Sequence, residues 1–144
     1  MTKIGLASDH AGFPLKQFVA QLLKEKGIET IDYGTYSTDS CDYPDFGHAL
    51  ARGMENGECE RGIAICGSGE GISMTLNKHQ MIRAALVWMP EIARLARQHN
   101  DANVLVMPAR FIPFEEVVKI TRIWLETPFE GGRHQRRVLK IEQF

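Results

Sequence analysis

The sequence lacks an excess of charge of either sign and contains no long apolar run. Its 17 Lys and Arg residues are balanced by 18 Asp and Glu residues, which indicates neither a basic surface for nucleic acid nor an acidic tail. No stretch approaches the roughly 18 apolar residues of a membrane span, and only a short apolar run precedes Asp9, too brief for a signal peptide. We therefore expect no nucleic-acid or membrane partner, but small molecules or copies of the chain itself.

Cysteines are also few, and the histidines show no metal pattern. Cys41, Cys59 and Cys66 include no CxxC pair and leave one thiol over in any pairing. A disulfide framework and a zinc knuckle are therefore not supported, and a reducing cytoplasmic location is expected. The five histidines form no HExxH motif, so we predict no metal.

The rest of the composition is that of a folded globular protein. The chain has 144 residues, of which 44% are hydrophobic and 24% charged, a mixture that excludes a disordered, collagenous or membrane protein. This is the length of one domain, and no repeat or linker divides it. We predict a single domain over residues 1–144.

Short β-branched or apolar runs alternate with segments of helical periodicity. We predict strands over residues 4–8, 29–33, 62–66, 83–88 and 103–107. The clearest helix is opened by Pro14 and closed by Gly27, and others are expected over residues 46–54, 71–76, 90–99 and 113–125, with a helical C-terminal segment from about residue 131. The alternation predicts a Rossmann-like three-layer αβα sandwich with a five-stranded, mainly parallel sheet.

A glycine-rich loop follows the third predicted strand. In Cys66-Gly67-Ser68-Gly69-Glu70-Gly71 the alternating glycines let backbone N–H groups approach an anion closely. No Gly-Lys-Ser/Thr follows, and Ile72 stands where G-x-G-x-x-G needs its last glycine, so nucleotide binding is the weaker interpretation. The same donors would stabilise an enediolate or oxyanion, which makes a carbanion-type reaction plausible.

Cys66 has two interpretations of about equal weight. Its place before the glycine loop would favour the thiolate, which serves as a base or nucleophile, whereas a cysteine that ends an apolar strand is ordinarily a buried thiol. Cys41 and Cys59 lack such neighbours and are taken as structural.

Three further groups of residues each have a structural interpretation beside the functional one. Asp9 follows the first predicted strand and suits either catalysis or the capping of the first helix. His99 ends a predicted helix, where a cation complements the helix dipole. Arg133 and Arg137 lie four residues apart on one helical face, a spacing that suits a phosphate group or a solvated basic surface.

Taken together, six motifs in order resemble the ribose-5-phosphate isomerase B family, which also includes galactose-6-phosphate and allose-6-phosphate isomerases. The motifs span nearly the whole chain: Ser8-Asp9-His10-Ala11-Gly12, Asp42-Tyr43-Pro44, Ile65-Cys66-Gly67-Ser68-Gly69-Glu70-Gly71-Ile72-Ser73, Asn77-Lys78, Arg97-Gln98-His99-Asn100-Asp101-Ala102-Asn103-Val104-Leu105 and Glu130-Gly131-Gly132-Arg133-His134-Gln135-Arg136-Arg137-Val138. The pattern matches the cysteine-type branch, since the other branch has Glu at the position of Ile72 and no cysteine before the loop.

The resemblance implies a cofactor-free aldose–ketose isomerase of the pentose phosphate pathway. It would interconvert ribose 5-phosphate and ribulose 5-phosphate by ring opening and a cis-enediolate, as a homodimer, or a tetramer built from it, with sites shared between subunits. On the family pattern Cys66 is the base, His99 the acid that opens the ring, and Asp9 assists at the sugar hydroxyls. Gly67, Ser68, Gly69 and Gly71 form the anion hole, Asn100 and Tyr43 hold sugar oxygens, and the phosphate ligands are His10, Arg110, Arg133 and Arg137.

Two departures and two alternatives accompany this resemblance. Glu70 replaces a usually neutral residue and would oppose the thiolate by like-charge repulsion unless it points to solvent, as we expect. Leu76 stands where Ala is common and would affect packing rather than chemistry. The alternatives are a six-carbon phosphosugar isomerase, which needs a longer pocket, and a non-catalytic sugar-phosphate-binding module.

Overall fold

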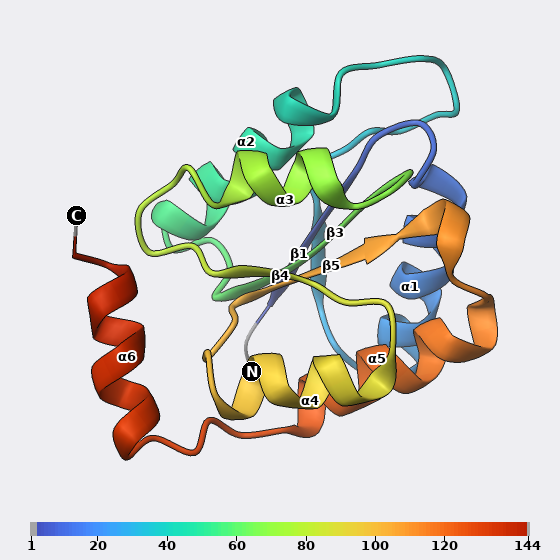
Figure 1. Cartoon of the computed structure of the whole chain (residues 1–144). Helices are drawn as coiled ribbons and strands as arrows, with labels where there is room; N and C mark the ends of the chain where they lie inside the picture. Colours follow the sequence, from blue (N-terminus) through green and yellow to red (C-terminus); the bar gives the residue numbers. More distant parts are fainter. Residues whose placement is uncertain (1–2, 144) are drawn as a thin grey trace.

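Strands and helices alternate along the chain in the computed structural model, which describes residues 3–143 (Figure 1). The strands are β1 (Ile4–Ser8), β2 (Thr30–Asp32), β3 (Arg61–Cys66), β4 (Ala84–Leu86) and β5 (Val104–Pro108). The helices are α1 (Phe13–Glu25), α2 (Tyr43–Glu55), α3 (Glu70–Leu76), α4 (Pro90–Gln98), α5 (Phe114–Glu126) and α6 (Arg133–Ile141), with a 3-10 helix over Ala109–Phe111.

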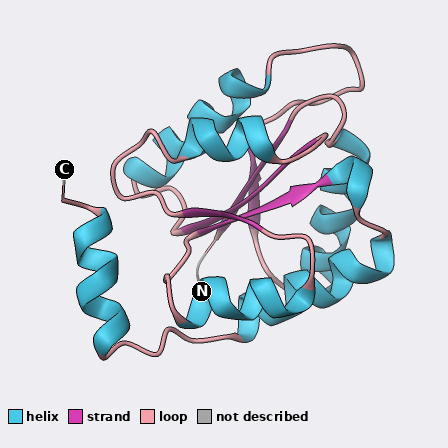
Figure 2. Cartoon of the chain, viewed as in Figure 1, coloured by secondary structure: helices cyan, strands magenta, loops and turns pink. Residues whose placement is uncertain are grey.

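The five strands form one parallel sheet in the order β2-β1-β3-β5-β4. Helices α2 and α3 cover one face, and α1, α4 and α5 cover the other (Figures 1 and 2). The predicted three-layer αβα class is therefore confirmed, and the sheet is wholly rather than mainly parallel. Within residues 3–143 no helix is long and apolar enough to cross a membrane; the cytoplasmic location stays a prediction.

Alternate side chains of the central strands fill two separate cores. Ile63, Ile65 and Met107 point toward α1, α4 and α5, where they pack with residues such as Val19 and Trp124. Ala64, Cys66 and Val106 belong to the core beneath α2 and α3. Because the central strands are buried on both faces, they appear in the sequence as continuous apolar runs.

Element boundaries differ from the prediction mainly where a helix begins or an edge strand ends. Helix α2 starts at Tyr43 rather than residue 46, because Asp42 is extended at the N-cap and Pro44 suits the first turn. Strands β2 and β4 lie at the edges of the sheet and have three residues each. The C-terminal segment predicted from about residue 131 forms α6, which lies at one end of the molecule, to the left in Figure 1.

One side chain closes part of the outer edge of β4. The Asn77 Nδ2 donates to the Ala84 carbonyl at 3.0 Å, and the Ala84 N–H donates to the Asn77 Oδ1 at 2.8 Å. A side-chain amide thus takes both hydrogen bonds that a neighbouring strand would make with this residue.

Candidate active site

Cys66 and Asp9 lie side by side at the carboxyl end of the sheet. Ser8 of β1 pairs with Ile65 of β3, so the next residues along the two strands are Asp9 and Cys66. The Asp9 N–H donates to the Ile65 carbonyl at 3.3 Å, which holds this junction together. Both residues are buried, at 7% and 4% exposure respectively. A carboxyl group and a thiol are therefore brought together at the edge where open α/β sheets bind their ligands.

The Asp9 carboxylate also shapes the backbone before α1, although no side chain hydrogen-bonds to cap this helix. Its Oδ1 accepts from the Gly12 N–H at 3.0 Å, and Gly12 is the N-cap of α1. A Cβ at Gly12 would lie 2.5 Å from the Ile65 carbonyl oxygen, so only glycine fits between α1 and β3. One carboxylate oxygen of Asp9 thus fixes the turn, which does not prevent the other from meeting a ligand.

The glycine loop runs from Cys66 into α3 and is held by contacts on both sides. Gly69 has φ +77°, a left-handed conformation that favours glycine. The Ser68 Oγ accepts from the Glu70 N–H at 3.2 Å, and both Ser68 and Glu70 are exposed. Glu70 therefore points to solvent, as expected. The loop keeps its shape through these local bonds and presents its backbone at the carboxyl end of β3.

Arg110 lies directly over Gly67. Its N–H donates to the Gly67 carbonyl at 3.0 Å, and a Cβ at Gly67 would lie 3.0 Å from Arg110 Nη1. A guanidinium group therefore stands beside the loop, and the absence of a side chain at Gly67 allows this contact.

Tyr43 and His10 complete the residues at this end of the sheet. A Cβ at Gly71 would lie 2.5 Å from the Tyr43 ring, so the ring rests on the first turn of α3. The Cys41 N–H donates to His10 Nδ1 at 3.2 Å, and the Cys41 Sγ lies 3.8 Å from the same nitrogen. Because Nδ1 accepts a hydrogen bond, a neutral His10 carries its proton on Nε2.

We call these residues the thiol set. They come from the carboxyl ends of β1, β3 and β5, the glycine loop and the N-terminus of α2: Asp9, His10, Tyr43, Cys66, Gly67, Ser68, Gly69, Gly71 and Arg110.

The other predicted site residues lie at the opposite end of the sheet. His99 is the C-cap of α4, and Asn100 follows it in the turn that precedes β5. The Gly62 N–H donates to the Asn103 carbonyl at 2.9 Å, so this turn adjoins the beginning of β3 rather than its end. Gly62 and Cys66 are four residues apart in β3, about 13 Å at about 3.3 Å per residue. His99 and Asn100 are thus separated from Cys66 of the same chain by the length of the sheet.

Helix α6 joins His99 at this end through a ring stack. The His99 and His134 rings are nearly parallel, with centroids 4.1 Å apart and an angle of 9°. The Glu130 Oε1 lies 3.4 Å from His134 Nε2 and 3.9 Å from His99 Nε2. Burial, together with the positive charges of His99 and Arg133, lowers the pKa of His134. Arg133 and Arg137 lie on the same helix, so we call His99, Asn100, Arg133 and Arg137 the arginine set.

His99, Glu130 and His134 are also the one group in residues 3–143 whose donor atoms could surround a metal ion, since they lie within 4.8 Å of one another. A tetrahedral zinc site needs nitrogen lone pairs that converge on one point about 2.0–2.1 Å away. The two stacked rings direct their lone pairs along nearly parallel planes instead. This arrangement fits ring stacking better than metal binding.

Sequence analysis missed the contacts made by Cys41, Glu130 and His134. The sequence predicts only a structural role for Cys41, which fixes the orientation of His10 from 31 residues away. Glu130 and His134 belong to a quoted motif but had no predicted role. No local sequence signal distinguishes Cys41. The position of His134 in the sequence, between the two predicted phosphate ligands, was a signal that could have been used. Cys59 is a core residue, and burial raises the pKa of its thiol.

Comparison with known proteins gives one consistent result. The sequence profile of the ribose/galactose isomerase family matches residues 4–141. Ribose-5-phosphate isomerase B of Escherichia coli (strain K12) is 45% identical over 141 residues, which cover 98% of this chain and 95% of that protein.

Two solved structures extend the similarity to the fold. A ribose 5-phosphate isomerase from Thermotoga maritima has a TM-score of 0.97 and 48% identity over 99% of each chain. Ribose-5-phosphate isomerase B of Mycoplasma genitalium, solved with bound ribulose-5-phosphate, has a TM-score of 0.92 and 43% identity, covering 98% of this chain and 94% of that one.

Proposed function

This chain belongs to the ribose/galactose isomerase family, and from that membership we propose that it interconverts D-ribose 5-phosphate and D-ribulose 5-phosphate. The observation that carries the proposal is the position of Cys66, beside Asp9 and immediately before a glycine loop at the carboxyl end of β3. A base and an array of N–H donors are what proton transfer next to a carbonyl group requires.

The chemistry at the thiol set needs no cofactor. As thiolate, Cys66 removes the proton from C2 of the open-chain aldose, and the electron pair forms a cis-enediolate whose negative charge lies on O1; the proton of the C2 hydroxyl then moves to O1. The thiol then returns the proton to C1, and the carbonyl re-forms at C2. Backbone N–H groups of Gly67, Ser68, Gly69 and Gly71, with the Ser68 hydroxyl, stabilise the enediolate oxygens. Asp9 binds the sugar hydroxyls through the oxygen that Gly12 leaves available.

The phosphate and the ring oxygen need groups from the arginine set. His99 donates a proton to the ring oxygen and so opens the furanose, while Asn100 and Tyr43 hold sugar oxygens. Arg133 and Arg137 are four residues apart on one face of α6 and grip the phosphate together with Arg110 and the Nε2–H of His10. This cationic grip supplies binding energy that orients the reacting carbons.

One chain cannot bring both sets to one substrate, because they lie at opposite ends of the sheet and a five-carbon phosphosugar is shorter than the distance between them. We therefore propose a homodimer in which the arginine set of one subunit completes the thiol set of the other. A two-fold axis then creates two equivalent sites. The position of α6 at one end of the molecule supports this arrangement, since a partner subunit can approach it there (Figure 1).

The first test is steady-state turnover of ribose 5-phosphate, allose 6-phosphate and galactose 6-phosphate, with Cys66→Ala as the control. A preference for the pentose that is lost in the variant supports the proposal. A preference for a hexose phosphate would change the substrate but keep the mechanism. Thermal protection by ribose 5-phosphate without turnover would favour a binding module.

A second test addresses the shared site. Cys66→Ala and His99→Asn chains, each inactive alone, are co-expressed and purified together. Random pairing gives about half hybrid dimers, each with one intact site, and so about a quarter of wild-type activity. A mixture as inactive as its components would show that the two sets do not meet between subunits.

A further inference from the structure

The turn that carries His99 and Asn100 has carbonyl groups that its own helix and strand do not satisfy. It links α4 to β5 and contains Asp101 with φ +48°, the left-handed conformation. Aspartate tolerates this conformation better than most residues, but the turn exposes the carbonyls of residues 100 and 101 to one side. Its exact shape decides where the His99 ring and the Asn100 amide point.

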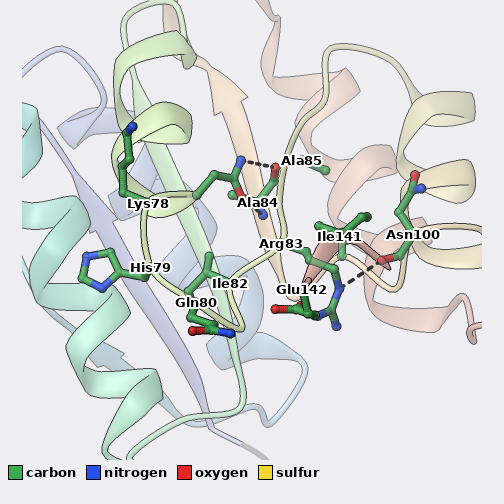
Figure 3. A pocket seen from close by; sticks show the side chains of 12 residues that line it. Lys78, His79, Gln80, Ile82, Arg83, Ala84, Ala85, Asn100, Ile141 and Glu142 are labelled. Carbon is green, nitrogen blue, oxygen red and sulfur yellow. Dashed lines mark hydrogen bonds and ion pairs between the residues drawn. The ribbon is translucent and has the colours of Figure 1, made fainter. Parts of the chain in front are cut away.

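Arg83 satisfies these carbonyl groups. Its Nε donates to the Asn100 carbonyl at 3.1 Å and to the Asp101 carbonyl at 3.2 Å, and Nη2 donates to the Asp101 carbonyl at 3.0 Å. Nη2 also lies 3.5 Å from the Asp101 carboxylate. Figure 3 shows Arg83 between Asn100 and Glu142. The planar guanidinium group thus holds the backbone of the turn at several points.

The same guanidinium group also binds the end of α6. Its Nη1 donates to Glu142 Oε1 at 2.6 Å, and the other Glu142 oxygen accepts from the Met81 N–H at 3.2 Å. The side chains of Arg83 and Glu142 are 16% and 20% exposed. An ion pair so largely shielded from water is weakened less by salt than an exposed one.

Helix α6 is therefore attached to the turn at two points. His134, near its start, stacks on His99, and Glu142, at its C-cap, binds Arg83. These residues are eight positions apart, about 12 Å along a helix at 1.5 Å per residue. Arg137 lies between the two attachments. A helix held at one point pivots, whereas a helix held at two keeps a fixed direction.

We propose that Arg83 is a positioning residue for the isomerase, fixing the His99–Asn100 turn and the phosphate-binding face of α6 relative to each other through its simultaneous bonds to the turn and to Glu142. This inference rests on the proposed function of the arginine set. Arg97 does not replace Arg83, because its bonds to Asp101, Ala102 and Thr127 do not reach α6.

The test compares two variants with a matched control. Glu142→Ala removes the bonds of α6 to Arg83 and to the Met81 N–H but leaves the bonds of Arg83 to the turn, so we expect KM for ribose 5-phosphate to rise about 3- to 10-fold with kcat within about twofold of wild type. In Arg83→Lys the ammonium cannot reach the turn carbonyls and Glu142 together. We expect this variant to raise KM and also to lower kcat about 10- to 100-fold, as small misplacements of catalytic groups do. The control is Arg94→Lys, since Arg94 is a half-exposed arginine on α4 that pairs with Glu91 of its own helix.

The double variant Arg83→Lys, Glu142→Ala should raise KM by less than the product of the single effects, because both changes break one link. Amide hydrogen exchange in α6 should be faster in Glu142→Ala than in wild type and unchanged in Arg94→Lys. The proposal is overturned if both variants keep kcat and KM within twofold of wild type, even if they melt at lower temperature. Inactivity of the wild-type protein would instead refute the proposed function. The hydrogen-exchange rates of α6 would then still test whether the bond between Arg83 and Glu142 holds this helix.

Discussion

The substitution Gly71→Ala tests the space beside the glycine loop without removing any of the loop's backbone N–H donors. Alanine keeps the N–H group that the enediolate needs, but its Cβ would lie 2.5 Å from Cε1 and Cζ of the Tyr43 ring. Ordinary carbon contacts lie at about 3.5–4.0 Å, so the ring must move by about 1 Å or more. We expect kcat/KM for ribose 5-phosphate to fall by up to about 10²-fold, the cost of such a displacement in a site that positions substrate.

The same substitution should have little effect on stability. Tyr43 is 40% exposed and has room to move, and alanine is favoured over glycine in a helix by about 1 kcal/mol. We expect the free energy of unfolding in urea to stay within about 1 kcal/mol of wild type. Loss of activity in a protein that unfolds normally would assign the effect to the site and not to the fold.

A double-mutant cycle identifies Tyr43 as the cause. In a Tyr43→Ala background the ring is gone, so adding Gly71→Ala should change kcat/KM by less than about twofold. Tyr43→Phe, measured alongside, reports the contribution of the hydroxyl alone. If Gly71→Ala is equally damaging with and without the ring, or harmless in the wild-type background, the role given to Tyr43 is refuted.

Three other substitutions test the remaining site. Cys66→Ala should lower kcat about 10²–10⁴-fold with little change in KM, because it removes the base; unchanged turnover would contradict that assignment. Arg137→Ala should chiefly raise KM, since the phosphate is bound alike in the ground and transition states, and a pure kcat effect would argue against it. Burial and nearby positive charge lower the pKa of His134, so the unfolded chain takes up a proton first as the pH falls below about 6.5, and stability falls with it. In urea titrations at about pH 7.5 and about pH 5.5, His134→Phe should show a smaller loss than wild type, and an equal loss would contradict the argument.

The sequence predicts the sheet well because buried strands carry continuous apolar runs. The run from Ile63 to Cys66 is buried on both faces and gives a strong local signal. Lys16 shows the limit of such patterns. It lies in α1 among exposed and buried positions, yet its ammonium is fully buried, bound to Asp32 and the Thr35 carbonyl at 2.5 Å each. Nothing in the helical periodicity predicts a partner 16 residues away.

The candidate site likewise has one part that the sequence predicts and one part that it does not. Asp9 and Cys66 end apolar strands, so parallel topology alone predicts that they meet. The position of His99 at the other end follows from the direction of α4, which runs back along the sheet, and the resemblance implied only that sites are shared. The bonds that Arg83 makes depend on tertiary packing, since the turn residues Asn100 and Asp101 are 17 and 18 residues away and Glu142 is 59 residues away, and no motif marks them.

The pairing of Asn77 with β4 bears on how the protein avoids fibre growth. An outer strand is a template on which further chains stack, and natural sheets protect it with charges, prolines or covering segments. Here a single side-chain amide occupies the N–H and carbonyl of Ala84, the first residue of β4, both of which an incoming strand would need. Because β4 has only three residues, one blocked position leaves no continuous ladder. The chain thus protects part of an edge strand with one uncharged side chain, where other sheets use charges, prolines or covering segments.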